Sequence, residues 1–345
     1  MDNFNKTRIV TDIEWMNKHP DLLLVSYTKG EDTNFEEQDG LVNVWATTLR
    51  TRPECTLVCQ SEVTKILSHP YRPNEVIGGT YAGYLVLWDI RVKRTPVIKS
   101  QLTNDTHSYP IYSLEIVGTE KSNTIVTVSN DGHLCSWPMA MFTSPQRFFD
   151  LKYNAKEVYV TCMGFPQEES NDFYIGAEDN SIYCGQMHNT SAISKSSNGI
   201  VDAFQSHHAP VTSISLHPTP VSWGKGHECS HIMLSASMDW SIKLWNPKMG
   251  KYPLASFESS QDYVLDVKWS PTHPSVFASC DADGYLDLWD IDADVENPVI
   301  RYKKDSNILH RLAWSHDGKR IAVGGGNGIV NVYEVNDEVL SFVLH

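Results

Sequence analysis

Residues 262–292 have the sequence DYVLDVKWSPTHPSVFASCDADGYLDLWDID. Three strand-length apolar runs follow one another in this stretch: Val264 to Trp269, Val276 to Ser279 and Tyr285 to Trp289. A Ser-Pro-x-x-Pro segment and an Asp-x-Asp-Gly segment separate the runs. Both favour chain reversal, because proline fixes φ and glycine tolerates φ > 0. The stretch therefore predicts an antiparallel meander that ends in a Trp-Asp pair.

The end of this meander recurs along the whole chain. The residues that close a β-rich segment after a turn are Trp45, Trp88, Trp137, Cys184, Trp245, Trp289 and Tyr333. Neighbouring marks lie 43 to 61 residues apart, and four of the six spacings are 43 to 47 residues. Four strands per unit, a period of about 40 to 45 residues and a Trp-Asp end are typical of propeller blades. The sequence thus predicts an all-β fold, a seven-bladed WD-repeat β-propeller.

We expect one domain, because a propeller is a single closed unit that can exceed the usual domain length. Residues 1–8 are predicted to be an amino-terminal flank, and residues 9–345 the propeller. The predicted blades are residues 9–60, 61–105, 106–154, 155–206, 207–259, 260–305 and 306–345. The fourth is degenerate, since Cys184 and Gly185 replace the Trp-Asp end. Val339 to Leu344 could supply the outer strand of the last blade or leave that place to the amino terminus.

Composition narrows the class of protein. Hydrophobic residues make up 41% of the 345 residues and charged residues 20%, which is typical of a chain with a large core. No apolar run approaches the ~18 residues of a membrane span, and the first residues lack a signal-peptide core. Seven irregularly spaced cysteines favour a reducing, cytosolic or nuclear compartment. A net charge of −14 disfavours nucleic acid and membrane surfaces but allows a basic protein partner.

The fifth predicted blade contains a His-Ser-Asp-Trp set that resembles a catalytic triad in composition. Its members are His207, Ser235 or Ser237, Asp239 and Trp245, and the third blade has a partial version with His107, Asp131 and Trp137. These residue types recur at repeat positions and not once per chain, so we interpret them as a structural hydrogen-bond set. No catalytic residue is predicted.

Other chemical motifs also favour simple explanations. Residues 227–231 (HECSH) have metal-ligand spacing, but no second ligand pair matches them, so no metal is predicted. The aspartates between Asp281 and Asp294 do not fit an EF-hand loop, because Gly284 is misplaced; we interpret them as a turn and a solvated rim. The chain has no Gly-x-x-x-x-Gly-Lys-Ser/Thr motif for nucleotide hydrolysis. We therefore expect no cofactor and no enzymatic activity.

Repeat position also predicts a binding face. Segments that enter each first strand and turns that follow each second strand should emerge on the same face of a propeller. The residues predicted there are Tyr81, Tyr109, Asn130, Met238, Trp240, Asp262 and Tyr263. Exposed aromatic residues are typical interface anchors. The alternative is that Trp240 and Tyr81 only cover blade edges.

Several segments resemble a particular family. They are GGTYAGYLVLWD (78–89), KRTPV (93–97), SNDGHLCSW (129–137), SMDWSIKLW (237–245), DYVLDVKWSPTHP (262–274) and LHRLAWSHDGKRIAVG (309–324). They look like the WD-repeat domain of the cytoplasmic dynein intermediate chain. The resemblance implies a non-catalytic scaffold that docks on the dynein heavy-chain tail and supports minus-end-directed cargo transport on microtubules in the cytoplasm. The seven residues of the predicted binding face are then candidates for contact with the heavy chain.

The resemblance also implies further partners. In this family a disordered amino-terminal arm binds light chains and dynactin. Because the sequence begins just before the first predicted blade, we expect that arm to be absent. We also expect most of the family's carboxy-terminal extension to be absent. Since dimerisation in the family is expected to come from the heavy chains and the arm, we expect the chain alone to be monomeric. Alternatives are an intermediate chain of an axonemal or intraflagellar dynein, or a generic WD-repeat peptide-binding adaptor. A ligand reader or enzyme would need convergent charged or metal-binding residues at the channel mouth, and the one such cluster, HECSH, lies in an insertion.

Overall fold

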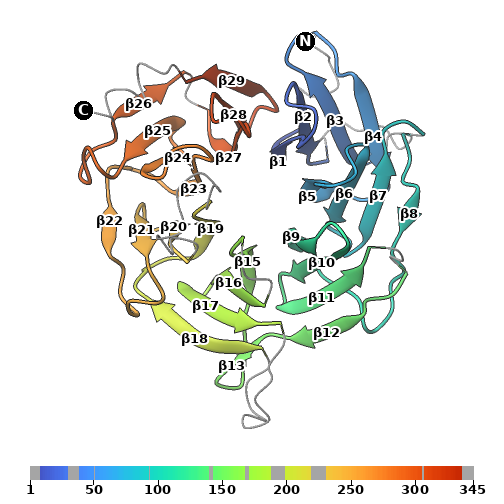
Figure 1. Cartoon of the computed structure of the whole chain (residues 1–345), viewed down its shortest axis with the longest axis horizontal. Helices are drawn as coiled ribbons and strands as arrows, with labels where there is room; N and C mark the ends of the chain where they lie inside the picture. Colours follow the sequence, from blue (N-terminus) through green and yellow to red (C-terminus); the bar gives the residue numbers. More distant parts are fainter. Residues whose placement is uncertain are drawn as a thin grey trace. The chain divides into compact units, whose positions relative to one another are not determined.

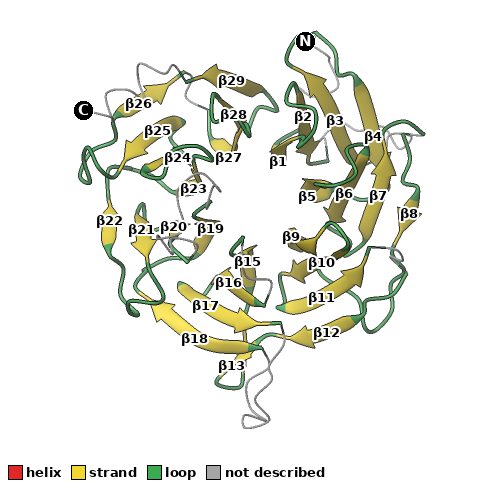
Figure 2. Ribbon diagram, in the orientation of Figure 1, coloured by secondary structure: helices red, strands yellow, loops and turns green. Residues whose placement is uncertain are grey.

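The structure, a computed structural model, describes residues 8–29, 39–49, 51–92, 94–139, 143–167, 171–187, 199–218, 231–304 and 307–335. The described residues form strands, turns and loops and contain no helix (Figure 2). They accordingly offer no helix that could cross a membrane. The chain divides into two compact units, residues 1–151 with 324–330, and residues 152–323 with 331–345. The predicted strand of residues 339–344 and most of the HECSH motif lie outside the described residues.

The first unit contains three four-stranded antiparallel sheets, labelled in Figure 1. In each sheet the strands pair in chain order, as in a meander. The first sheet consists of β1 (Val10–Trp15), β2 (Leu22–Tyr27), β3 (Gly40–Ala46) and β4 (Cys55–Cys59); the second of β5 (Val63–Ser68), β6 (Glu75–Thr80), β7 (Leu85–Asp89) and β8 (Ile98–Lys99); the third of β9 (Ile111–Thr119), β10 (Ser122–Ser129), β11 (His133–Pro138) and β12 (Arg147–Asp150).

The second unit continues the same pattern. Its sheets are β15 (Val160–Gly164), β16 (Asp172–Ala177), β17 (Ser181–Gln186) and β18 (Ile200–Gln205); β19 (Val211–Leu216), β20 (Met233–Ser237), β21 (Ile242–Trp245) and β22 (Ala255–Phe257); and β23 (Val264–Trp269), β24 (Val276–Asp281), β25 (Tyr285–Asp290) and β26 (Ile300–Lys303). The last sheet, β27 (Leu309–Trp314), β28 (Arg320–Gly325) and β29 (Val330–Glu334), has three strands among the described residues. Seven successive meander sheets define a seven-bladed β-propeller, which confirms the predicted fold class.

A short hairpin was not predicted from the sequence. It pairs β13 (Lys152–Tyr153) with β14 (Lys156–Glu157) and lies across the predicted limit between the third and fourth blades. Asn154 and Ala155 form its two-residue turn with φ values of 50° and 63°. Two positive φ values are typical of the tight turn that matches strand twist. The ring of Tyr153 lies 5.2 Å from that of Tyr183 in β17, so the hairpin packs on the fourth sheet.

The core of each unit lies between consecutive sheets. One cluster joins the first and second sheets through residues such as Leu24, Val44 and Trp88, and another joins the fifth and sixth through Leu234, Trp269 and Trp289. The inner strands read as apolar runs because sheet neighbours cover both of their faces. The closing tryptophans Trp88, Trp137, Trp245 and Trp289 are all fully buried.

Consecutive sheets are also linked by threonines at the start of the first strands. The strand register shifts between the first and third residues of β1, β5, β15, β19 and β23. In four of these strands the residue at the shift is a threonine whose hydroxyl donates to the backbone carbonyl that begins the next first strand. The pairs are Thr11 with Val63 (2.7 Å), Thr64 with Ile111, Thr161 with Val211 (2.6 Å) and Thr212 with Val264 (2.7 Å). These bonds fix where four of the first strands, β5, β9, β19 and β23, begin.

Candidate functional site

In six of the sheets a backbone hydrogen bond joins the segment that enters the first strand to the turn that follows the second strand. In the first unit the donor and acceptor pairs are Thr28 to Ile9 (2.9 Å), Tyr81 to Glu62 (2.9 Å) and Asn130 to Pro110 (3.1 Å). In the second unit they are Glu178 to Tyr159 (3.0 Å), Met238 to Pro210 (3.0 Å) and Ala282 to Tyr263 (2.9 Å). We call these paired segments the turn face of each unit. The seven residues of the predicted binding face all lie on such segments.

In the first unit the structure brings Tyr81 and Tyr109 onto adjacent segments. Gly83, with a φ of +81°, packs so closely that a Cβ atom there would lie 2.5 Å from the His107 carbonyl oxygen and 3.2 Å from that of Tyr109. The Tyr81 side chain is 58% exposed and the Tyr109 side chain 55%. Asn130 is only partly exposed and belongs to the next turn. The two tyrosines are thus the accessible aromatic groups on this part of the turn face.

In the second unit Met238, Trp240 and Tyr263 are exposed on neighbouring sheets. The Thr212 bond to Val264 joins the fifth sheet, next to the Met238 turn, to the residue after Tyr263. Trp240 is 50% exposed and Tyr263 47%. Asp262 is half-buried, and its carboxylate accepts the Tyr263 backbone N–H at 2.7 Å. These four predicted residues therefore lie on one continuous part of the second unit.

Sequence reasoning missed three exposed residues at the same repeat position. Ile9, Tyr159 and Ile308 each stand just before a first strand, as Tyr263 does, and each is exposed. The signal that could have found them was the repeat position itself, because a large apolar residue stands immediately ahead of the first apolar run in four of the seven sheets. Tyr159 and Ile308 add to the apolar surface of the second unit.

Trp240 has an uncommon backbone conformation. Its φ is +67°, in the left-handed region. The equivalent turn positions in the described sheets are Gly83, Gly132, Asn180, Gly284 and Gly328, all with positive φ. A bulky residue in that region loses roughly 1 kcal/mol to contact between its Cβ and the backbone. The turn therefore keeps a tryptophan where glycine would be less strained.

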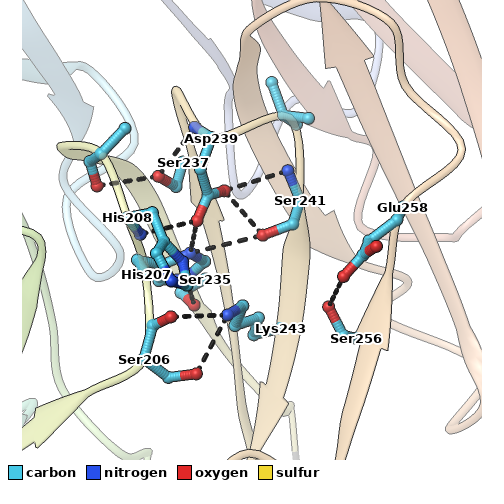
Figure 3. A network of polar contacts seen from close by, with 12 residues as sticks. Ser206, His207, His208, Ser235, Ser237, Asp239, Ser241, Lys243, Ser256 and Glu258 are labelled. Carbon is cyan, nitrogen blue, oxygen red and sulfur yellow. Dashed lines mark hydrogen bonds and ion pairs between the residues drawn. The ribbon is translucent and has the colours of Figure 1, made fainter.

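The polar residues around this turn hold its geometry (Figure 3). The Asp239 carboxylate accepts the Ser241 N–H at 3.0 Å, the Ser241 hydroxyl at 2.6 Å and the His208 N–H at 3.0 Å. The Asp239 N–H in turn donates to the Ser237 hydroxyl at 3.1 Å. The backbone on both sides of Trp240 is fixed by these bonds, so the indole is held at the tip of the turn.

The structure brings His207, Ser235, Asp239 and Trp245 together in one chain of hydrogen bonds. His207 Nδ1 lies 2.9 Å from Asp239 Oδ2, and its Nε2 lies 2.6 Å from Ser235 Oγ. The Trp245 indole N–H donates to the same Ser235 oxygen at 2.8 Å. Ser237, the alternative serine, bonds to the Ala209 carbonyl instead. Ser235 is fully buried, so no substrate reaches its hydroxyl, and the arrangement supports a structural role.

Electrostatics agree with a neutral histidine beside an ionised aspartate. Burial lowers the pKa of His207, although Asp239 acts in the opposite direction. Burial opposes ionisation of Asp239 too, but hydrogen bonds from His207 and Ser241 hold the pKa of that carboxyl well below its usual range. His207 then donates from Nδ1 to Asp239 and accepts the Ser235 hydroxyl at Nε2.

The third sheet has a related set in which a threonine joins the indole. His107 Nδ1 lies 2.9 Å from Ser129 Oγ, and Nε2 lies 2.6 Å from Thr127 Oγ1. The Trp137 indole donates to Thr127 at 2.8 Å, and Ser129 donates to Asp131. Burial, with a smaller effect of His133, lowers the pKa of His107 to about 3. The sequence-based version of this set lacked Thr127 and Ser129.

The sixth sheet corrects the interpretation of the aspartates as a solvated rim. Asp281, Asp287 and Asp290 are each only 2% exposed. The Arg301 guanidinium lies 3.6 Å from Asp287 and 3.9 Å from Asp281 and compensates their charge. Burial raises the pKa of Asp287 to about 6, against the lowering effect of Arg301. This burial cannot be predicted from the pattern of apolar and polar residues along the strands that carry the aspartates. The cation that compensates the carboxylates comes from a different strand, the outer strand β26.

The described residues contain no group of three or more His, Cys, Asp or Glu side chains arranged to hold a metal ion. Within the HECSH motif, His227 and Cys229 lie outside the described residues. His231 is buried, with its Nδ1 3.4 Å from the Tyr174 hydroxyl.

Comparison with known proteins first identifies the class of protein to which the chain belongs. The WD domain, G-beta repeat family matches residues 199–246, 251–290 and 297–334. Together with the seven meander sheets, this match shows that the chain is a WD-repeat β-propeller. The cytoplasmic dynein 1 intermediate chain of Drosophila melanogaster is 36% identical to it over 342 residues, which is 98% of this chain and 50% of that relative. This similarity confirms the predicted resemblance to cytoplasmic dynein intermediate chains, and the chain spans about half the length of that relative.

Proposed function

We propose that the chain is a non-catalytic scaffold subunit of a cytoplasmic dynein. It docks on the heavy-chain tail and supports minus-end-directed cargo transport on microtubules in the cytoplasm. The similarity over 98% of the chain to an intermediate chain supports the assignment to dynein. The buried position of Ser235 in the His-Ser-Asp set supports a scaffold rather than a hydrolase.

The observation that carries the docking proposal is the exposed aromatic surface on the turn face of the second unit. Trp240 and Tyr263 are about half exposed, and Met238 beside them is exposed as well. Tryptophan and tyrosine are enriched among the few residues that supply most of the binding energy of an interface. A partner that covers both rings would remove a large apolar area from water.

The test is the affinity of the chain for purified heavy-chain tail fragments. We expect selective binding of one tail segment, and at least about tenfold weaker binding by the Trp240→Ala, Tyr263→Ala double variant. Tyr252→Ala is the matched control, because Tyr252 is 82% exposed but lies on the connection between β21 and β22 of the fifth sheet. Circular dichroism of both variants checks the fold.

Other outcomes distinguish the alternatives. Capture of axonemal or intraflagellar tail fragments in preference to cytoplasmic ones would assign the chain to another dynein class. No capture of any tail fragment, by a folded chain that behaves like an unrelated seven-bladed WD propeller, would contradict the proposal and favour a peptide-binding adaptor. Unchanged binding by the double variant would remove Trp240 and Tyr263 from the docking surface.

A further inference from the structure

The segments that form the turn face of the fifth and sixth sheets are rich in acidic residues. The four segments that form it there are residues 206–210, 238–240, 258–263 and 282–284. They contain no lysine or arginine of their own, and their acidic residues are Asp239, Glu258, Asp262 and Asp283. Two cations from other strands reach them: Lys243 donates to the Ser206 carbonyl at 2.7 Å and Arg301 to the Ser259 carbonyl at 2.9 Å. Glu258 is exposed and Asp262 and Asp283 are partly exposed. We call Trp240, Tyr263, Glu258, Asp262 and Asp283 the aromatic–acidic patch.

The two rings of the patch are open. Among the described residues, neither the Trp240 ring nor the Tyr263 ring has an aromatic or cationic partner. Tyr285, in the same sixth sheet, shows the contrasting case: the Arg301 guanidinium lies 4.2 Å from its ring centroid and the Lys303 ammonium 4.4 Å. A ring face with nearby carboxylates attracts a cation through its quadrupole and through charge. Trp240 and Tyr263 offer such faces without a cation of their own.

The Trp240 turn also presents its ring in a fixed position. The hydrogen bonds of Asp239 to Ser241 and His208 hold the backbone on both sides of the indole. A partner therefore does not have to order this turn when it binds, which lowers the entropic cost of association. A tryptophan in the left-handed region destabilises the fold, and glycine would avoid this strain. The presence of tryptophan here indicates that its side chain has a role other than stability.

We infer that the aromatic–acidic patch binds a protein segment that carries arginine or lysine. A guanidinium or ammonium group lies against the Trp240 or Tyr263 ring while Glu258, Asp262 and Asp283 balance its charge. Positive protein segments rather than nucleic acids fit this patch, because phosphates would be repelled by the same carboxylates. The identity of the partner rests on the proposed function. The inference adds to that function that the tail segment that docks here is basic.

A first experiment tests the chemistry without dynein. The probes are an eight-residue amidated peptide in which arginine and leucine alternate, and its counterpart with neutral citrulline at every arginine. The full chain is labelled with 5-fluorotryptophan, and Trp240→Phe identifies the resonance of Trp240. We expect the arginine peptide to shift that resonance on titration and the citrulline peptide to bind at least about tenfold more weakly.

Charge-neutral variants then locate the site. Asp262→Asn, Asp283→Asn should weaken binding of the arginine peptide about 3- to 10-fold. Asp292→Asn, Asp294→Asn is the matched control, because both aspartates are exposed on the connection between β25 and β26. Equal affinity for the two peptides, no binding of either, or an effect of the control pair as large as that of the patch pair would overturn the inference.

The same variants in the tail-binding assay separate this inference from the proposed function. Tail binding that is insensitive to Asp262→Asn, Asp283→Asn and to salt would contradict the basic segment while leaving the dynein scaffold intact. Selective binding of the arginine peptide without capture of any heavy-chain tail would support the patch and contradict the heavy chain as its partner.

Discussion

At the residue scale, the side chain and the backbone of Trp240 have different effects: the side chain is expected to affect binding, and the backbone angle to affect stability. Glycine or asparagine occupies the equivalent turn position in the other described sheets with a left-handed residue there, and Trp240 is half exposed, so its ring adds little to the core. Only the loss of its side chain should matter to a partner, whereas only its backbone angle should matter to the fold. Two substitutions at this one position can therefore distinguish the two effects.

Trp240→Gly should have a free energy of unfolding about 1 kcal/mol higher than that of Trp240→Ala, because glycine adopts a φ of +67° without Cβ strain. Both variants lose the ring and should bind the tail equally weakly. Urea denaturation and the tail-binding assay measure the two effects. An alanine variant as stable as the glycine variant would show that this turn carries no strain.

The buried side chain of His107 makes the free energy of unfolding depend on pH. Its pKa falls from 6.5 to about 3 in the folded chain, chiefly through burial. Above about pH 6.5 the folded and unfolded states are both neutral at this residue. Below that pH the unfolded chain takes up a proton that the folded chain does not, so acid favours unfolding until the pH approaches 3.

The wild-type free energy of unfolding should therefore fall by up to about 1.4 kcal/mol more per pH unit than that of His107→Gln between pH 6 and pH 4. Urea denaturation at several pH values gives the two slopes. His19→Gln, at an exposed histidine, is the control and should keep the wild-type slope. Parallel slopes for wild type and His107→Gln would mean that His107 is protonated in the folded chain.

At the scale of elements, the first strands are held by both packing and threonine. Each of Thr11, Thr64, Thr161 and Thr212 lies where the strand register shifts and donates to the next sheet. Asp12 and Asp266 add a second link, since their carboxylates accept the backbone N–H groups of Ile66 and Leu312, each at 3.0 Å. The order of the sheets is thus fixed by directional bonds as well as by apolar area.

Thr212→Val keeps the volume of the side chain but removes its bond to the Val264 carbonyl. We expect a loss of about 1 kcal/mol in the free energy of unfolding, and faster amide hydrogen exchange at the start of β23. Thr47→Val, at a threonine whose bond to Asp21 is exposed, should change stability by less than about 0.5 kcal/mol. Equal effects of the two substitutions would show that the threonine links do not stabilise the fold.

At the scale of the whole molecule, the net charge of the chain affects its association with other proteins. A charge of −14 repels a second copy of the chain and attracts a basic partner over the distance that salt leaves unscreened. We expect sedimentation equilibrium of the chain alone to give the mass of a monomer at physiological salt.

The rate of association with the tail should fall at least about tenfold between 0.05 and 0.5 M salt, while dissociation changes less. Stopped-flow mixing measures both rates. An association rate independent of salt would mean that charge plays no part in the encounter, and a dimer in sedimentation would show that part of the exposed apolar surface pairs two copies.

The repeat in the amino-acid sequence predicts the number of sheets, their meander order and the tryptophans that close five of them. These features repeat along the chain, and each depends on local preferences: apolar runs for strands, and Asp, Asn or Gly where the chain must reverse. The repeat position also predicted Tyr81, Tyr109, Met238, Trp240 and Tyr263 as surface residues, because one position recurs at one place in every sheet.

Other features depend on residues that lie far apart in the chain and meet only in the folded protein. The burial of Asp281 and Asp287 depends on Arg301 from the next strand, and the register shift at Thr212 depends on a carbonyl 52 residues away. Strand propensity follows from neighbours in sequence, whereas burial, charge compensation and strain at Trp240 follow from neighbours in space.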